Sequence, residues 1–253
     1  MSDFDRNIAA RGSYGAGTAA VVDAGLRAYM IRVYNYMAVG VALTGLVAYA
    51  TFNAAVVTGP NGAITGLTSF GQAIFSGPLT IVLFLATLGI VFFMSFRIDR
   101  LQPSTAFALF MGYAALLGLM LSSVFLAYTG ASITRTFFIS AASFGALSLY
   151  GYTTQKDLSA MGSFLIMGLF GIILASLVNI FLKSSGLEFA ISAIGVLIFA
   201  GLTAYDTQRI KEMYDVQDDG SVAGRKAVMG ALALYLDFIN LFLFLLRFMG
   251  DRR

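Results

Sequence analysis

The chain has 253 residues, of which 58% are hydrophobic and 11% are charged, and its net charge at neutral pH is +3. Soluble domains carry about 25% charged residues, so this composition leaves too little polar surface for a chain that faces water on all sides. The absence of Cys and His excludes disulfides, thiolate metal sites and histidine-based catalysis. The sequence has no run of basic residues that would indicate nucleic-acid binding. The expected partner is a lipid bilayer.

The first 30 residues are polar and rich in Ala and Gly. They lack the compact order of charged, apolar and small residues that marks a cleaved signal peptide. We predict a flexible cytoplasmic N-terminal tail over residues 1–30 and one transmembrane domain over residues 31–250.

Apolar stretches long enough to cross a membrane recur along the rest of the chain. A spanning helix needs about 20 mostly apolar residues. Seven stretches meet this requirement: 33–52, 78–96, 105–128, 133–151, 161–182, 189–209 and 228–248. The predicted fold class is therefore an all-α integral membrane protein with seven transmembrane helices. The uncharged connection 53–77 contains Gly59-Pro60-Asn61-Gly62, which indicates a turn in an extracytoplasmic loop.

The distribution of Lys and Arg predicts the orientation of these spans. Eleven of them fall on the side of the N-terminus and five on the opposite side, which places the N-terminus in the cytoplasm. Seven crossings then place the C-terminus outside. The terminal pair Arg252 and Arg253 favours an alternative in which 228–248 is a re-entrant hairpin and the C-terminus returns to the cytoplasm.

Polar side chains inside the spans are candidates for helix packing or for function. Ser176 and Asn179 in the fifth span are expected to hydrogen-bond a neighbouring helix. Two acids lie deeper: Asp206 in "TAYDTQRI" and Asp237 in "ALALYLDFINLFLFLLRF". Ionisable groups in a span are costly, so each acid is a functional hypothesis.

The two acids are predicted to lie at one depth. If the sixth helix ends near Tyr214 and the seventh begins near Val228, each acid is about 12–14 Å from the connecting loop. Carboxylates in contact cannot both ionise cheaply, so a touching pair shares a proton and changes charge between mildly acidic and neutral pH. The alternatives are that Asp206 pairs with Arg209 and that Asp237 hydrogen-bonds Asn240.

A basic partner for the acids is also expected. Arg97 and Arg100 end the second span on the cytoplasmic side, the side nearer both acids. Either arginine could reach a carboxylate, or it could extend to lipid headgroups instead.

Three stretches, "GLTAYDTQRIKEMYD", "ALALYLDFINLFLFLLRF" and "SAASFGALSLYGYTT", resemble the Bax inhibitor-1 family. The resemblance covers about residues 30–250. It implies a bacterial inner-membrane protein whose last helix is central and wrapped by the other six. It further implies a pH-sensitive calcium leak channel, with Asp206 and Asp237 as a hydrogen-bonded pair and Arg97 or Arg100 as a latch. Some bacterial relatives interact with a membrane-bound quality-control protease.

The expected activity is therefore conduction rather than catalysis. Ca²⁺ prefers oxygen ligands, and a leak requires that Asp206 and Asp237 bind the ion only weakly and transiently. No cofactor is expected. The pattern of intramembrane aspartyl proteases is incomplete, because "YLDFIN" lacks Gly-x-Gly-Asp, and 228–248 lacks the lysine of a retinal photoreceptor. The alternative function is a non-conducting interaction protein that modulates a membrane protease.

Overall fold

The computed structural model describes residues 3–59 and 63–253, with side chains described from Asp23 onward. Its long helices follow the predicted order along the chain: α1 (Asp3–Ala55), α3 (Leu79–Arg97), α4 (Pro103–Leu121), α6 (Gly130–Thr153), α7 (Ser159–Leu182), α8 (Ser185–Glu212) and α9 (Gly220–Met249). Shorter elements connect them: the strands β1 (Val56–Thr58) and β2 (Ile64–Leu67), the helices α2 (Ser69–Phe75) and α5 (Val124–Ala127), and the 3-10 helix η1 (Ile98–Arg100).

Within the described residues, six helices are long and apolar enough to cross a membrane. They contain six of the seven predicted spans. The remaining one, 133–151, forms α6 but is not among the six. The stretch contains Arg135 and several Ser and Thr residues, which lower its mean hydropathy. Four of the hydroxyl side chains of α6 are buried in the bundle: those of Ser132, Thr136, Ser140 and Ser148. Membrane crossing by α6 stays a prediction.

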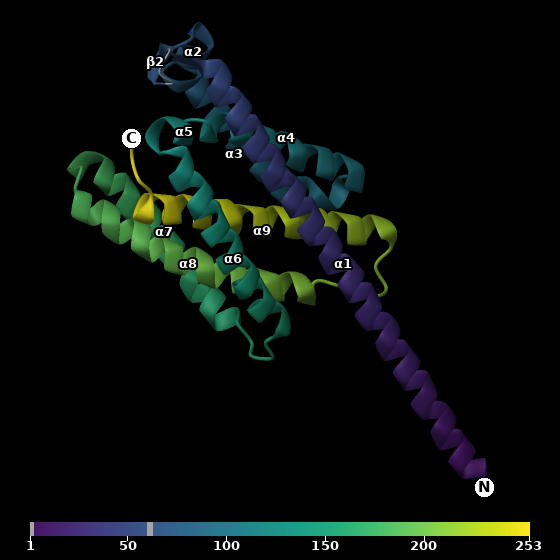
Figure 1. Cartoon of the computed structure of the whole chain (residues 1–253). Helices are drawn as coiled ribbons and strands as arrows, with labels where there is room; N and C mark the ends of the chain where they lie inside the picture. Colours follow the sequence, from purple (N-terminus) through teal and green to yellow (C-terminus); the bar gives the residue numbers. More distant parts are fainter. Residues whose placement is uncertain (1–2, 60–62) are drawn as a thin grey trace.

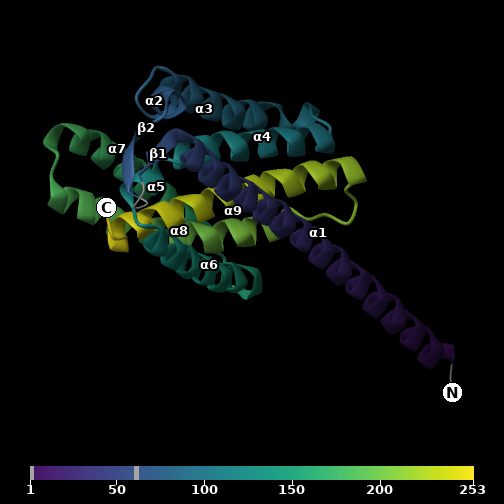
Figure 2. The same cartoon turned by 45° about the horizontal axis from the view of Figure 1, so that its top comes forward.

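The last long helix, α9, is the most buried of the candidate spans. It packs against α1, α4, α6 and α8, whereas α3 packs mainly on α4 and α7 mainly on α8. The apolar window of α9 is 67% buried, compared with 44% for α8 and at most 28% for the other candidate spans. Figure 2 shows α9 between α4 on one side and α6 and α8 on the other. Full enclosure by six helices stays a prediction.

A buried tyrosine fixes α9 against two of its neighbours. Tyr235 is fully buried, and its hydroxyl lies 2.6 Å from the hydroxyl of Thr44 in α1. The rings of Phe110 and Tyr113 in α4 meet the Tyr235 ring edge-on, with centroids 5.4 and 5.8 Å away. Edge-to-face pairs of this kind are favourable beyond the area they bury. The buried hydroxyl is thus satisfied, and α1, α4 and α9 are held together at one level.

The assumed start of α9 and the alternative of a re-entrant hairpin are both wrong. The helix begins at Gly220 rather than near Val228, because Asp219 caps it by accepting hydrogen bonds from the backbone N–H groups of Ser221 and Val222, at 2.8 and 2.7 Å. It then continues unbroken to Met249, so residues 228–248 do not form a re-entrant hairpin.

The C-terminal residues lie at the end of the bundle where α6 begins. The Arg253 N–H donates to the Ala127 carbonyl at 3.0 Å, and the Thr129 N–H donates to the Asp251 carbonyl at 3.1 Å. The carboxylate of Asp251 also pairs with Arg135 at 3.0 Å. The C-terminus therefore ends beside the start of α6, at the opposite end of α9 from its connection to α8 (Figure 1).

The N-terminal part of α1 covers most of the predicted tail. Its backbone is helical from Asp3, and Figure 1 shows it running out beyond the other helices. The flexibility of this segment and its cytoplasmic location stay predictions. Strands β1 and β2 form an antiparallel hairpin within the predicted loop 53–77, and residues 60–62 of the predicted turn lie outside the described residues.

Close backbone approach between α6 and α8 gives a first prediction. A Cβ at Gly151 would collide with the Ala204 carbonyl of α8, whereas a Cβ at Gly145 in the same helix would meet open space. We expect Gly151→Ala to destabilise the protein by about 1–3 kcal/mol through overpacking. Gly145→Ala should be neutral, or stabilising by about 0.5–1 kcal/mol, because alanine favours helix.

Thermal unfolding of the two variants in the same detergent, followed by circular dichroism, compares them directly. Equal melting temperatures would contradict the close approach of α6 and α8.

Candidate functional site

The structure brings the two predicted acids together. Asp206 in α8 and Asp237 in α9 lie with their carboxyl groups within hydrogen-bonding distance of each other. Asp237 is only 4% exposed, and its Oδ2 atom is buried without a conventional hydrogen-bond donor. A carboxyl oxygen that lacks a donor in a buried site is costly unless a proton is shared with it. The geometry therefore suits a pair that holds one proton between two carboxyls.

The route by which the acids meet differs from the prediction. Asp206 is six residues before the end of α8 and Asp237 is 17 residues after the start of α9. At a rise of about 1.5 Å per residue, these separations are ~9 and ~26 Å along the two helices, rather than ~12–14 Å each. The contact is still made because α9 extends well beyond the end of α8, and residues 213–219 bridge the offset (Figure 1).

The basic residue that acts on the acid pair is Arg209. It lies one turn after Asp206 and interacts with it electrostatically, while its own side chain is exposed. Arg97, at the end of α3, and Arg100, in η1, are both exposed. The ion pairs of the described part of the chain are Arg135–Asp251, Lys226–Asp218 and Arg252–Glu188, so neither proposed latch arginine bridges either acid. The latch stays a prediction.

A cavity of about 580 Å³ adjoins the acids between α7, α8 and α9. Asp206, Asp237, Ser176 and Asn240 supply the polar part of its lining. The Asn240 amide donates to the Leu236 carbonyl at 2.8 Å, so it is not the hydrogen-bond donor to Asp237 that the alternative required.

The predicted cross-helix hydrogen bonds of α7 are wrong. The Ser176 hydroxyl donates to the Ile172 carbonyl of its own helix at 2.7 Å. The Asn179 side chain accepts from the Ser184 N–H at 3.0 Å, across the turn into α8. Both side chains satisfy local backbone groups, which is an option that polar residues near helix ends often take.

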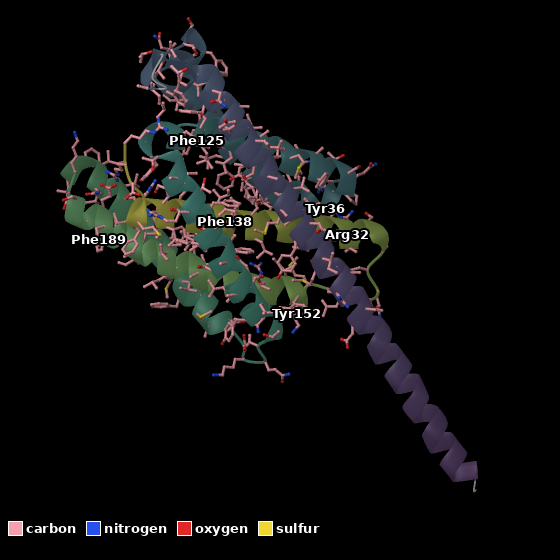
Figure 3. The ribbon with its side chains drawn as sticks, viewed as in Figure 1. Arg32, Tyr36, Phe125, Phe138, Tyr152 and Phe189 are labelled. Carbon is pink, nitrogen blue, oxygen red and sulfur yellow. The ribbon has the colours of Figure 1, made fainter. Side chains whose placement is uncertain are left out.

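Three residues that follow Asp206 anchor α8 and were not singled out from the sequence. Gln208 accepts from the Leu158 N–H at 2.9 Å and donates to the Lys156 carbonyl at 2.8 Å. Lys211 donates to the carbonyl of Tyr152 at 2.9 Å, near the end of α6 (Figure 3). The "DTQRIK" stretch thus holds the end of α8 against the connection between α6 and α7.

The third residue, Thr207, belongs to a chain of hydroxyl groups. Its Oγ1 atom lies 2.9 Å from the Ser148 hydroxyl, which lies 2.6 Å from the Tyr34 hydroxyl of α1. The Thr207 hydroxyl also reaches the Thr203 carbonyl at 2.7 Å. The sequence does contain a signal for these hydrogen bonds. Thr207 and Gln208 are uncharged polar residues at the end of an apolar helix, where each side chain needs a hydrogen-bond partner.

The acid pair does not form a full set of ligands for a resident metal. Among the residues that the structure describes, no three acidic side chains gather in one place. Ca²⁺ takes about 6–8 oxygen ligands in a stable site. Two carboxyls with the Asn240 amide beside them suit, at most, a cation in transit.

The fold and this site define an all-α membrane protein with a contacting pair of carboxyls buried between its last two helices. Residues 26–253 match the family described as inhibitor of apoptosis-promoting Bax1, and the chain belongs to this Bax inhibitor-1 family.

Bacterial relatives match over nearly the whole chain. Identity is 51% over 231 residues with the uncharacterized protein RP147 of Rickettsia prowazekii, which covers 91% of this chain and 92% of the relative. It is 48% over 233 residues with the inner membrane protein YbhL of Escherichia coli, covering 91% and 94%. An uncharacterized protein of Caulobacter vibrioides is 45% identical over 260 residues, covering 100% of both chains.

The anchoring of α8 gives a second prediction. Gln208 is buried and satisfies two backbone groups, so Gln208→Leu leaves both without partners. Each unpaired buried group costs about 1–3 kcal/mol, and we expect a destabilisation in that range or above it. Thermal unfolding in detergent measures the loss.

The control is Gln217→Leu in the exposed connection before α9, where only the backbone N–H makes a hydrogen bond. A melting temperature for Gln208→Leu equal to that of the control would remove the anchoring role.

Proposed function

We propose that this protein is a pH-sensitive cation leak channel that passes Ca²⁺ and is gated by the carboxyl pair of Asp206 and Asp237. The observation that carries the proposal is the contact between these two carboxyls, one of them 4% exposed, inside a bundle of apolar helices. Intramembrane acids are expensive and are usually retained for ion or proton pathways.

The proposed gating follows from the charge of the pair. With one shared proton the pair carries a single negative charge, which attracts a nearby arginine. Arg209 is placed to supply this attraction, and Arg97 or Arg100 would act as the latch on the cytoplasmic side. Acidification adds the second proton and makes the pair neutral. The arginine then loses its partner, and α8 and α9 are free to separate.

The proposal includes a topology. We place the protein in the bacterial inner membrane, because its relative YbhL is named an inner membrane protein, with the N-terminus in the cytoplasm as the Lys and Arg count favours. The seventh crossing is α6, whose buried hydroxyls would be sheltered by its neighbours, with α9 as the central helix. No cofactor and no catalytic step are part of the proposal.

A flux assay with the purified protein in liposomes tests gating. We expect Ca²⁺ entry to rise about tenfold as the pH falls from about 8 to about 6, a change that corresponds to ~1.4 kcal/mol in the open–closed equilibrium. Asp206→Asn and Asp237→Asn remove the titrating pair, so each variant should lose this pH response. Ca²⁺ entry is read from a dye inside the liposomes.

The matched control is Asp157→Asn, an exposed acid in the connection between α6 and α7. Its Oδ1 atom accepts from the Ser159 N–H at 2.8 Å, a bond that the amide oxygen of Asn can keep. This variant should retain the wild-type pH profile. Unchanged profiles for both acid-pair variants would reject gating by the pair. No flux from the purified wild-type protein would instead favour the alternative of an interaction protein that acts on a membrane protease.

A further inference from the structure

We propose that the cavity beside the acid pair binds a lipophilic amine, an organic molecule with a protonated nitrogen and an apolar body. The inference shares Asp206 and Asp237 with the proposed function but does not require conduction. It rests on the opening, the lining and the volume of the cavity.

The cavity opens on the outer surface of the bundle. Two of its lining residues, Ile173 and Leu177 of α7, are 46% and 52% exposed. Both belong to a helix that is long and apolar enough to cross a membrane. A molecule dissolved in the bilayer would therefore reach the cavity from the side, between α7 and α9, with α8 behind it.

The polar groups of the cavity select a cation that donates hydrogen bonds. Ser176 donates to a carbonyl of its own helix, and so does Asn240. What the lining offers are acceptors: the two carboxyls and the Asn240 carbonyl oxygen. Asp206 is only partly buried, so its carboxyl is the acceptor that a ligand ammonium can reach, and the buried Asp237 beside it adds to the negative charge of the site.

The charges around the cavity agree with this choice. No Lys or Arg is among the lining residues. Arg209 acts on Asp206 from the exposed side of α8, and Arg247, which stacks on Phe244, is about three turns along α9 from Asp237. The acids are therefore the charged groups that a molecule inside the cavity would meet.

The remaining walls select an apolar body of moderate size. Leucine, isoleucine and alanine side chains make up half of the lining residues, and the stacked rings of Phe199 and Phe244, with centroids 5.6 Å apart, complete its apolar part. Aromatic rings attract ammonium groups as well as apolar surface. A volume of about 580 Å³ far exceeds the needs of a bare ion and lies within the range of about 300–1,000 Å³ typical of small-molecule sites.

Binding of 1-adamantanamine tests the inference against 1-adamantanol, which has the same apolar cage without the positive charge. Tritiated forms of both are titrated onto the full chain in nanodiscs of phosphatidylcholine, whose headgroup has no net charge. We expect saturable binding of the amine, one molecule per chain, and at least about tenfold weaker binding of the alcohol, the ratio given by ~1.4 kcal/mol.

Two variants locate the site. Asp237→Asn removes the buried charge and should weaken amine binding at least about tenfold, which corresponds to ~1.4 kcal/mol. Ala233→Phe fills the cavity without changing charge and should have a similar effect, since Ala233 is part of its lining. Asp157→Asn and Ala141→Phe are the controls, because Ala141 lines a different cavity between α1 and α6. Both controls should bind like the wild type.

Equal binding of the amine and the alcohol would overturn the inference. It would mean that both molecules bind through their apolar cages alone, without recognition of the positive charge. Wild-type binding by Asp237→Asn, in a variant whose melting temperature shows that it is folded, would also overturn it. The result of the binding experiment does not depend on the result of the flux assay. Amine binding without flux would reject the channel and keep the site, whereas pH-dependent flux without amine binding would reject the site alone.

Discussion

The contact between Asp206 and Asp237 is the constraint on which the rest of the structure depends. Two carboxyls in a poorly hydrated site can be neighbours only if they hold a proton between them or share a cation. This requirement ties the charge of the site to the distance between α8 and α9. The helices around them are made mostly of aliphatic and aromatic side chains, which do not provide another means of setting that distance by charge.

Each of the two helices that carry an acid is fixed to different neighbours. Tyr235 holds α9 to α1 and α4 through a hydroxyl pair and two edge-on rings. Gln208 and Lys211 hold α8 to the connection between α6 and α7. Most of these bonds are made by hydroxyl and amide groups, which stay uncharged across the physiological pH range. A change in protonation at the acid pair therefore acts where α8 and α9 pack against each other, between the bonds that fix each helix to its other neighbours.

The sequence was sufficient to predict the helices and the two acids, because both leave strong signals. An apolar run of about 20 residues has few alternatives to a spanning helix, and an acid inside such a run stands out. It was insufficient for the start of α9, since Asp219 caps the helix within a polar stretch that looked like a loop. It was also insufficient for the distance of each acid from the loop that connects α8 and α9. The expected distances rest on a start of α9 near Val228, whereas the helix begins at Gly220 and therefore extends well beyond the end of α8.

The roles of the uncharged polar residues follow the same logic. Ser176 and Asn179 have the composition of cross-helix contacts, yet they bond to the backbone nearby, while Gln208 makes the long-range bonds. The difference lies in burial: Gln208 is 7% exposed and lies beside the Leu158 N–H and the Lys156 carbonyl of another segment, whereas Ser176 is within reach of a carbonyl of its own helix. In a bilayer every polar group needs a hydrogen-bond partner, and the nearest available group supplies it. The acids are the exception, because a carboxyl has no donor of its own until it takes up a proton, and for each of them the group that can share this proton is the other acid.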